Sequence, residues 1–390
     1  MRWRYQETVL TLCTLAFFAT MVGRLAISPV VPLITDDFAV SNSAIGVALT
    51  GMWIAYSASQ FPSGVLADRF GERLVILVAI GGTAIASLVL AVAPLFVLFV
   101  FGTIALGAVA GLHYSVATTL LTRTYDNLGT AIGIHNTGSP AAGLIAPPIV
   151  AWIGVRYGWR TAVATGAVMA APVVLLFAWR IRPTEPRRPD QPMSDRFELA
   201  PLFELLARPK IAFPTLLAIF CTFVWQATAS FLPTFLVFHR GQSAEFAGLV
   251  FAGYFVVQSP AQIGIGWLSD HYGRDFATAG CMVLGVAGFG LLIAVPGLFA
   301  LALAILLIGT GLSYQAALFP RFMDVLSAEE RAAGFGLVRS VYGIVAGVGS
   351  VVTGVVADAF GWDVAFAVLA VMLAIVCAAL VVNWALSLGY

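Results

Sequence analysis

The chain has 390 residues, of which 60% are hydrophobic and 10% charged, and its formal net charge at pH 7 is +1. A soluble globular domain usually has about 45–50% apolar and about 25% charged residues, so the composition excludes that class. Apolar stretches of about 20 residues recur along the whole length, and each can cross a bilayer core of about 30 Å as a helix. Ten-residue segments of alternating polarity are absent from the sequence, which excludes a porin-type barrel. We therefore expect an all-α polytopic membrane protein whose partners include the lipid bilayer and no nucleic acid.

The apolar stretches predict twelve membrane-spanning helices, which in chain order cover residues 8–35, 43–66, 73–93, 95–122, 128–154, 160–180, 210–238, 244–268, 276–295, 297–323, 332–357 and 361–386. Proline and charge gather in residues 181–209, which we interpret as a linker between two six-helix bundles, 1–180 and 210–390. The linker contains FELAPLFELLA, which predicts a short amphipathic helix on the membrane surface. The start MRWR before an apolar run imitates a signal peptide, but the eleven later spans favour an uncleaved first helix.

Basic residues predict the orientation of these helices, because loops rich in Lys and Arg stay on the cytoplasmic side. One side receives Arg2, Arg4, Arg69, Arg73, Arg123, Arg180, Arg182, Arg187, Arg188, Arg196, Arg208, Lys210, Arg274, Arg321 and Arg331. The other side receives Arg156, Arg160 and Arg240. Both termini and the linker are therefore predicted to lie in the cytoplasm, with the chain in the cell membrane.

Motifs of enzymes and of metal or nucleotide sites are absent from the sequence. The four cysteines stand singly in apolar helices without metal-ligand spacing, which favours a role in packing. The single lysine, Lys210, follows Arg-Pro and no glycine-rich loop, so ATP is not the expected energy source. There is neither a GxSxG elbow nor an HExxH pair. We expect no enzymatic activity, no cofactor and no metal.

The two halves repeat at an offset of 202 residues. The segment GVLADRFG at 64–71 falls on GWLSDHYG at 266–273. At the same offset, Thr20, Arg24 and Ser28 fall on Thr222, Gln226 and Ser230, and Gly46 and Gln60 fall on Gly248 and Gln262. Each triplet has i, i+4, i+8 spacing and predicts a polar stripe on one face of a helix. Repeated halves imply a binding site at their interface near the bilayer midplane and a rocking motion around it.

The segment GVLADRFGER, between the second and third predicted helices, resembles the loop signature of the major facilitator superfamily. The degenerate second copy GWLSDHYGRD, the twelve helices and the central linker extend this resemblance over the whole chain. It implies the major facilitator fold of two pseudo-symmetric six-helix bundles. It also implies a gating loop made of Gly64, Asp68, Arg69, Gly71 and Arg73, with Asp270 and Gly273 in the second copy. In this family resemblance, Asp68 lies near the cytoplasmic end of the eleventh helix and takes part in a latch that holds the outward-facing state.

Glycines in this loop also have a physical interpretation. Gly64 permits a close approach of helices, and Gly71 permits a tight turn.

Two arginines lie inside the predicted membrane helices, whereas every Asp and Glu falls in a loop or at a helix end. Arg24 is about 15 residues into the first helix and Arg339 about 8 into the eleventh, which places both near mid-membrane. An arginine cannot avoid the cost of burying its charge by losing its proton. The favoured interpretation is an anionic ligand held by guanidinium groups. The structural alternative is that the arginines snorkel or bind backbone carbonyls freed by Pro29 and Pro32.

Further polar residues in the spans are candidates for substrate contact or for helix bridging. Predicted substrate contacts besides the arginines are Gln226, Asn136, Tyr56, Gln258, Tyr314 and Gln315. Gln60, Tyr254 and Gln262 extend these polar faces. His113 and His135 can change charge near neutral pH and are candidates for a coupling proton, with a helix-bridging hydrogen bond as the alternative.

Within the superfamily, the segment around Arg24 is similar to the organic anion:cation symporter group, in which an arginine precedes a serine and a proline. That group also has an arginine and a glutamate in its fourth helix, which the segment TIALGAVAG at 103–111 lacks. Arg339 resembles the eleventh-helix cation of carboxylate exchangers.

The sequence therefore predicts a monomeric secondary transporter of a small organic anion, most of all a carboxylate, by alternating access. Proton symport and exchange with a counter-anion are both open. The first alternative is a drug or lipophilic-compound exporter of the same fold, which usually keeps an acid in the membrane. A receptor or scaffold without turnover and a channel with a constriction ring are further alternatives.

Overall fold

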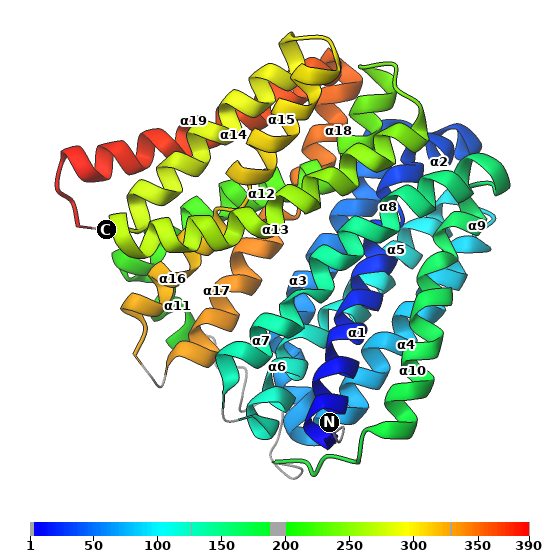
Figure 1. Cartoon of the computed structure of the whole chain (residues 1–390), viewed down its shortest axis with the longest axis vertical. Coiled ribbons are helices and arrows are strands. Elements are labelled where there is room, and N and C mark those ends of the chain that lie inside the picture. The colour runs from blue at the N-terminus through cyan, green and yellow to red at the C-terminus, as the bar shows by residue number, and fades with distance from the viewer. Residues whose placement is uncertain (1–3, 126, 188–199, 328–329, 390) are drawn as a thin grey trace.

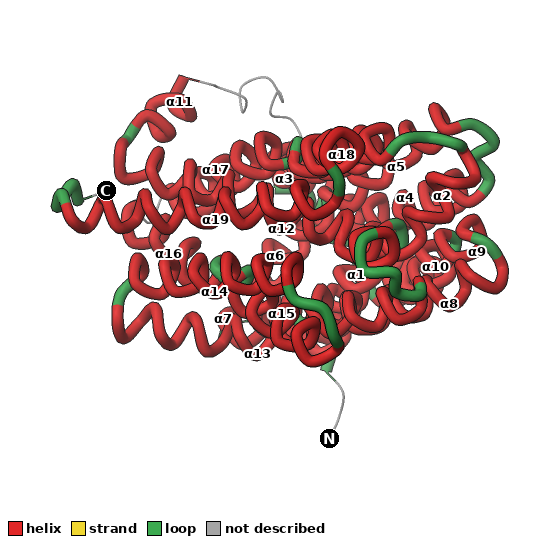
Figure 2. The backbone as a smooth tube through the Cα atoms, turned by 90° about the horizontal axis from the view of Figure 1, so that it is seen from above, coloured by secondary structure: helices red, strands yellow, loops and turns green. Residues whose placement is uncertain are grey.

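The computed structural model describes residues 4–125, 127–187, 200–327 and 330–389. These residues form α-helices joined by short loops, one short 3-10 helix and no strand, as Figure 2 shows. The predicted all-α fold is thus confirmed. The uncertain part of the linker, 188–199, lies outside the described residues, and the helix predicted at its end is observed as α11, Ala200–Ala207.

Two groups of helices lie beside each other, coloured blue to green and light green to red in Figure 1. The first bundle contains α1 (Tyr5–Leu25), η1 (Ser28–Val30), α2 (Val31–Phe38), α3 (Asn42–Phe70), α4 (Glu72–Ala91), α5 (Phe96–Gly111), α6 (His113–Thr124), α7 (Leu128–Asn136), α8 (Gly138–Tyr157), α9 (Trp159–Val163) and α10 (Thr165–Arg180). The second bundle contains α12 (Pro209–Phe238), α13 (Ala244–Tyr272), α14 (Arg274–Ala294), α15 (Leu298–Gly311), α16 (Gln315–Val325), α17 (Glu330–Ala346), α18 (Gly349–Phe360) and α19 (Trp362–Ala385).

Eleven spans in the described part of the chain are long and apolar enough to cross a membrane. The helix α3, which the sequence predicts as the second span, is not among these eleven although it has 29 residues. Its middle carries Tyr56, Ser57, Ser59 and Gln60, and α5, α17 and α18 pack along it. Because other helices cover α3, its polar side chains do not have to face lipid.

Several spans that the sequence predicts as continuous helices are broken, so the predicted single helices are wrong there. In the first span, α1 ends at Leu25 and η1 contains Pro29, which has no backbone N–H to continue the helix. The fourth span breaks at Leu112 and the tenth around Tyr314. An offset of 202 carries Leu112 onto Tyr314, so the repeat preserves this break. The breaks place helix ends, and thus free backbone groups, in the interior of the protein.

The pseudo-twofold axis of the repeat passes between Ser28 and Ser230. The Ser28 hydroxyl donates to the Ser230 carbonyl oxygen at 2.9 Å, and the two residues are 202 positions apart. A residue can contact its own repeat mate only near the axis that relates the two halves. The structure thus supports the offset that the sequence predicts, although Ser28 lies in η1 and not on the same helix as Thr20 and Arg24.

Polar contacts join the two bundles at the end of the molecule where α3 and α13 begin, which we call the sealed end. The Asp358 carboxylate of α18 accepts hydrogen bonds from the backbone N–H groups of Asn42 and Ser43 at 3.1 and 2.8 Å, and from the Asn42 side chain at 2.8 Å. It therefore caps the first turn of α3, a helix of the other bundle. On the opposite side of the axis, Arg156 of α8 pairs with Glu245 of α13 at 3.7 Å. Both sides of the sealed end therefore use a charged side chain near the end of a helix, Arg156 in α8 and Asp358 in α18.

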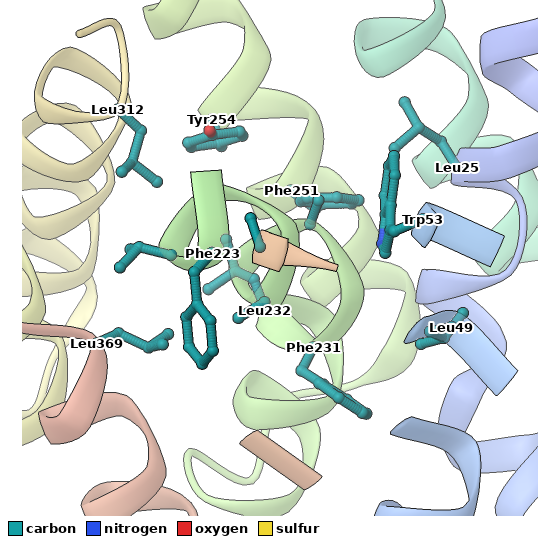
Figure 3. Packing of buried hydrophobic residues seen from close by; sticks show 14 of the residues in the cluster. Leu25, Leu49, Trp53, Phe223, Phe231, Leu232, Phe251, Tyr254, Leu312 and Leu369 are labelled. Atoms are coloured by element: carbon teal, nitrogen blue, oxygen red, sulfur yellow. The ribbon is translucent and has the colours of Figure 1, made fainter. Parts of the chain in front are cut away.

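A continuous apolar core lies behind this end and includes residues of both bundles. Figure 3 shows Leu25, Leu49 and Trp53 from the first bundle together with side chains from the second, among them Phe231 and Phe251. The Trp53 side chain is buried, and its Nε1 donates to the Ser230 hydroxyl at 3.1 Å. Trp53 therefore belongs to the apolar core and is also hydrogen-bonded to Ser230 at the axis.

Glycines let α3 and α18 approach closely at the sealed end. A Cβ atom added to Gly354 would lie 2.4 Å from the Asn42 carbonyl oxygen, and one added to Gly46 would lie 2.7 Å from the Ser350 carbonyl oxygen. Small residues at such crossings allow backbone-to-backbone packing, which is a main source of helix association in membranes.

We expect Gly354→Ala to destabilise the protein, because its methyl group meets backbone that cannot rotate away; the cost of such overpacking is about 1–3 kcal/mol. Gly290→Ala is the matched control, since a Cβ there meets no described atom within 4 Å. The control should be neutral or more stable by up to about 1 kcal/mol, because alanine favours helix over glycine. Thermal unfolding of the two purified variants in the same detergent measures the difference, and equal stability would contradict the assigned packing.

Candidate functional site

Arg24 is 3% exposed and lies in the last turn of α1. Its guanidinium carbon is 3.9 Å from the centroid of the Tyr56 ring and 5.6 Å from that of Trp53. Its Nε donates a long hydrogen bond of 3.4 Å to the Thr20 carbonyl oxygen, while Nη2 is buried without a hydrogen-bond partner. A cation at a helix C-terminus meets the negative end of the helix dipole, and aromatic faces add cation–π attraction. These contacts offset part of the cost of burial but leave one strong donor unused.

Arg339 of α17 has a similar environment in the second bundle. Its guanidinium carbon is 4.7 Å from the Tyr114 ring centroid and 5.9 Å from that of Phe335. It also interacts electrostatically with the side chains of Tyr342 and Tyr56. Its Nε is buried without a hydrogen-bond partner. Within the described residues, neither Arg24 nor Arg339 forms an ion pair with a carboxylate.

Tyr56 connects the two arginines, because its ring contacts Arg24 and its side chain also interacts with Arg339. It is the central residue of α3, with fourteen residues of the helix before it and fourteen after it. At 1.5 Å per residue it lies about 21 Å from either end. The structure therefore brings the predicted residues Arg24, Arg339 and Tyr56 together at mid-depth between the bundles. We call the two arginines the arginine pair.

The two predicted histidines lie beside the arginine pair in the first bundle. His113 begins α6 and His135 is near the end of α7, and their ring centroids are 5.5 Å apart. Phe17 stacks on both rings, at 5.8 and 5.2 Å, and Tyr114 contacts the His135 ring at 5.8 Å. Both histidines are buried, and none of their four ring nitrogens makes a hydrogen bond of normal geometry. Both rings interact with the Cys13 backbone of α1, so the helix-bridging role considered from the sequence stays open.

Other predicted residues divide into bonded and unbonded groups. Gln258 donates to the Tyr254 hydroxyl and to the Leu312 carbonyl oxygen, both at 3.1 Å. The hydroxyl groups of Tyr314 and Thr222 lie 3.0 Å apart. Gln258 and Tyr314 therefore bridge helices in this structure, and their predicted contact with substrate stays a prediction.

Gln226, the repeat mate of Arg24, is different because it is 4% exposed and its Oε1 has no hydrogen-bond partner. Gln315 begins α16 and is half-buried, while Asn136 ends α7 and is exposed. An offset of 203, at which Gly158-Trp159 fall on Gly361-Trp362, pairs Asn136 with Arg339, but no contact between these two residues is described. Asn136 and Gln315 remain predictions as substrate contacts.

Aromatic residues of the site were missed by sequence reasoning. These residues are Tyr114 and Tyr342, which interact with Arg339, and Trp225. Trp225 packs edge-on against Trp53 of the other bundle at 5.6 Å. A signal was present for two of them, since Tyr342 follows Arg339 by three residues on one helix face and Tyr114 directly follows His113. Trp225 gives no such signal, because an aromatic residue in an apolar helix predicts only a place in the hydrophobic core.

The predicted gating loop joins α3 to α4, and its turn is as expected. Gly71 has φ +82° and its repeat mate Gly273 has φ +98°, backbone conformations that favour glycine. The Arg73 side chain donates to the Ala178 carbonyl oxygen at 2.6 Å and so ties the loop to α10. Asp68 is half-buried in the last turn of α3, beside the exposed Arg69. The predicted close helix approach at Gly64 is wrong, because an added Cβ meets no described atom within 4 Å there and the tight crossing lies instead at Gly46 and Gly354.

Ion pairs next to the two loops are reversed between the bundles. Buried Glu72 at the start of α4 pairs with Arg123 of α6 at 3.1 Å. In the second bundle, Arg274 at the start of α14 pairs with Asp324 of α16 at 3.2 Å and also with Asp270. Offsets of 202 and 201 relate the two pairs, so acid and base have exchanged places. The attraction between the helices, and not the sign of either charge, is what both bundles retain.

Two cavities lie away from the arginine pair. One of about 500 Å³ is lined by loop residues that include Arg240, Pro296 and Leu298, and an apolar one of about 310 Å³ is lined by residues that include Phe18, Ile149 and Met169. Neither contains a residue of the arginine pair. The candidate site is therefore identified by the buried charges and unbonded polar atoms of the arginine pair, and not by the size of a cavity.

Known proteins resemble this chain in sequence and in fold. The family model described as Major Facilitator Superfamily matches residues 13–245 and 236–387. The chain belongs to the major facilitator superfamily. Family and fold are those of membrane transporters. The chain also resembles a solved bacterial homolog to human lysosomal transporter, Spinster, with a TM-score of 0.82 and 16% identity over 97% of both chains.

Curated members of the superfamily that the chain resembles have different substrates in their names. A hexuronate transporter of Bacillus subtilis (strain 168) is 24% identical over 69% of this chain and 65% of its own length. A probable sulfoacetate transporter of Cupriavidus necator is 27% identical over 46% of this chain and 42% of its own. A multidrug resistance protein of Shigella dysenteriae is 25% identical over 56% of both chains. The matched segments thus span about two thirds of these relatives or less.

We expect Glu72→Arg to destabilise the protein, because it places like charges together where Glu72 is 2% exposed; breaking a buried pair costs about 3–5 kcal/mol. The double variant Glu72→Arg/Arg123→Asp copies the reversed pair of the second bundle and should recover at least half of that loss. Thermal unfolding in detergent checks this, with Glu204→Arg on the exposed face of α11 as the control for added positive charge. A double variant no more stable than Glu72→Arg would count against the reversed-pair relation.

Proposed function

We propose that this member of the major facilitator superfamily moves a small organic anion, most of all a carboxylate, across the cytoplasmic membrane by alternating access. One observation carries the proposal: Arg24 is buried at mid-depth, with a guanidinium donor unused and no carboxylate partner in the described structure. Burial of a charge inside a membrane protein is costly and by default marks a functional site. A bound carboxylate supplies the missing acceptors and the opposite charge.

The arginine pair supports a shared anion site. Arg339 also keeps a buried Nε without a partner, and Tyr56 lies between the two guanidinium groups. Gln226 adds a polar side chain from α12, so both bundles contribute to the site. Such a site between the halves, near their axis, suits a mechanism in which the two bundles rock around the bound substrate.

The orientation follows from the positive-inside rule. The gating loop, the linker and both termini belong on the cytoplasmic side, which makes the sealed end extracellular. In this assignment the structure is closed by Asp358, Arg156 and their partners toward the outside. We propose that the chain works as a monomer in the cell membrane with both termini in the cytoplasm.

A drug or lipophilic-cation exporter is the second candidate, since a multidrug resistance protein is among the similar proteins. A cationic substrate needs a carboxylate inside the membrane. Among the described residues, Glu72 at the start of α4 is the one buried acidic residue. Its carboxylate pairs with Arg123 of α6. The charges available at mid-depth therefore favour an anion.

We expect Arg24→Gln to lower counterflow uptake in proteoliposomes at least tenfold for whichever anion the protein carries, because the charged hydrogen bonds lost are worth about 1.5–3 kcal/mol each. The assay uses a panel of monocarboxylates, dicarboxylates, sugar acids and inorganic anions. Arg180→Gln removes an exposed arginine at the end of α10 and should transport like the parent protein. Uptake of a neutral or cationic compound that survives Arg24→Gln, with no anion carried, would overturn the proposal.

We propose His113 and His135 as candidates for a coupling proton, because His113 interacts with Arg24, His135 contacts His113, and an imidazole can change charge. If protons are coupled, an inward proton gradient drives uptake in the parent protein, and His113→Gln or His135→Gln removes that dependence while anion counterflow continues. If uptake responds to a counter-anion and not to pH, the protein is an exchanger and the histidines have a structural role.

A further inference from the structure

The arginine pair is surrounded by aromatic rings from both bundles, which we call the aromatic wall. It consists of Trp53, Tyr56, Tyr114, Trp225, Phe319 and Phe335. Trp53 contacts Trp225 at 5.6 Å across the bundles beside Arg24, and Phe335, beside Arg339, contacts Phe319 at 5.8 Å. Five helices, α3, α6, α12, α16 and α17, therefore present rings near one place.

Most of these rings keep accessible surface. Tyr56, Tyr114, Trp225, Phe319 and Phe335 are half-buried, whereas Trp53 is 2% exposed. Their contacts with the arginine pair and with one another place them between the bundles. The surface they keep is thus available to a molecule held there.

Some polar groups at the same place already have partners, whereas the four ring nitrogens of His113 and His135 have no hydrogen bond of normal geometry. Gln258, Tyr314 and Ser230 already form hydrogen bonds between helices. Unused acceptors and donors among the residues described here include Arg24 Nη2, Arg339 Nε and Gln226 Oε1. Two guanidinium donors suit one carboxylate, and the aromatic wall suits a flat apolar body.

We propose that the substrate is an aromatic monocarboxylate, with its carboxylate on the arginine pair and its ring against the aromatic wall. This inference rests on the proposed function and narrows it to one class of anion. Ring-to-ring contacts prefer stacked or edge-on geometry and add to the affinity beyond the area that they bury. Stacking on Tyr114 and Phe335 places the ligand ring beside Arg339, whose guanidinium already lies over both.

The test compares benzoate with cyclohexanecarboxylate, glucuronate and succinate as counterflow substrates in proteoliposomes. Benzoate and cyclohexanecarboxylate have nearly the same size and the same charge and differ in aromaticity. We expect benzoate to be carried at least tenfold faster than glucuronate or succinate, and faster than cyclohexanecarboxylate. In Tyr114→Leu and in Phe335→Leu, the benzoate to cyclohexanecarboxylate ratio should fall about two- to tenfold, the loss expected from one aromatic contact. Because the ratio is taken within one variant, a change in the amount of folded protein cancels.

Phe299→Leu is the matched control, since this ring is 84% exposed in α15 and should leave the ratio unchanged. Arg24-dependent transport of glucuronate or succinate at or above the benzoate rate would overturn this inference while the proposed function stands. Equal rates for benzoate and cyclohexanecarboxylate, or an unchanged ratio in both leucine variants, would also overturn it. Absence of Arg24-dependent transport of every anion would overturn the proposed function and this inference together.

Discussion

A guanidinium group inside a bilayer-spanning protein is the constraint on which the rest of this structure depends. Arg24 cannot lose its proton and lies too deep to reach water easily, so the protein must supply other compensation. It does so with the C-terminal end of α1 and the faces of Tyr56 and Trp53. The proline-rich break after α1 thus has an electrostatic consequence, because it creates the helix end on which Arg24 lies. The compensation is incomplete, because Nη2 keeps no hydrogen-bond partner in the described structure, and the proposed anion would supply one.

Symmetry explains how such a site arises from a repeated chain. The offset of 202 residues brings Ser28 onto Ser230 at the axis, and offsets of 202 and 201 relate the reversed ion pairs beside the two loops. Structural contacts are thus kept in both halves even where the charges exchange. The site itself departs from symmetry, since Arg24 corresponds to Gln226 and each bundle supplies its arginine from a different helix. A symmetric scaffold with an asymmetric interior can rock as two halves while it binds a ligand in one orientation.

Sequence alone predicts much of this molecule, because the bilayer imposes a strong pattern on composition. The sequence alone indicates the long apolar runs, the repeat, the turn at Gly71 and the two arginines. It does not indicate the breaks at Leu112 and Tyr314, since polar residues such as His113 and Gln315 also occur inside unbroken helices and no proline stands beside either break. Tyr114 and Trp225 were missed for a related reason: which rings face the arginines depends on how helices from two bundles meet, and one sequence carries no record of such contacts. Gln258 shows the reverse, because a polar residue in an apolar helix indicates a partner without indicating whether that partner is substrate or protein.

Trp53 belongs both to the site and to the sealed end, and this double role bears on how binding could act on conformation. Its ring lies beside Arg24 and Trp225, while its Nε1 donates to Ser230, whose hydroxyl is 2.8 Å from that of Ser350 on α18. A ligand changes a conformational equilibrium only through interactions that differ between the states. An anion that draws Arg24 away from the aromatic faces changes the packing of Trp53, and Trp53 is hydrogen-bonded to the residue on the axis. Trp53 is therefore the single side chain that joins the contacts at the axis to Arg24, the residue proposed to bind the anion.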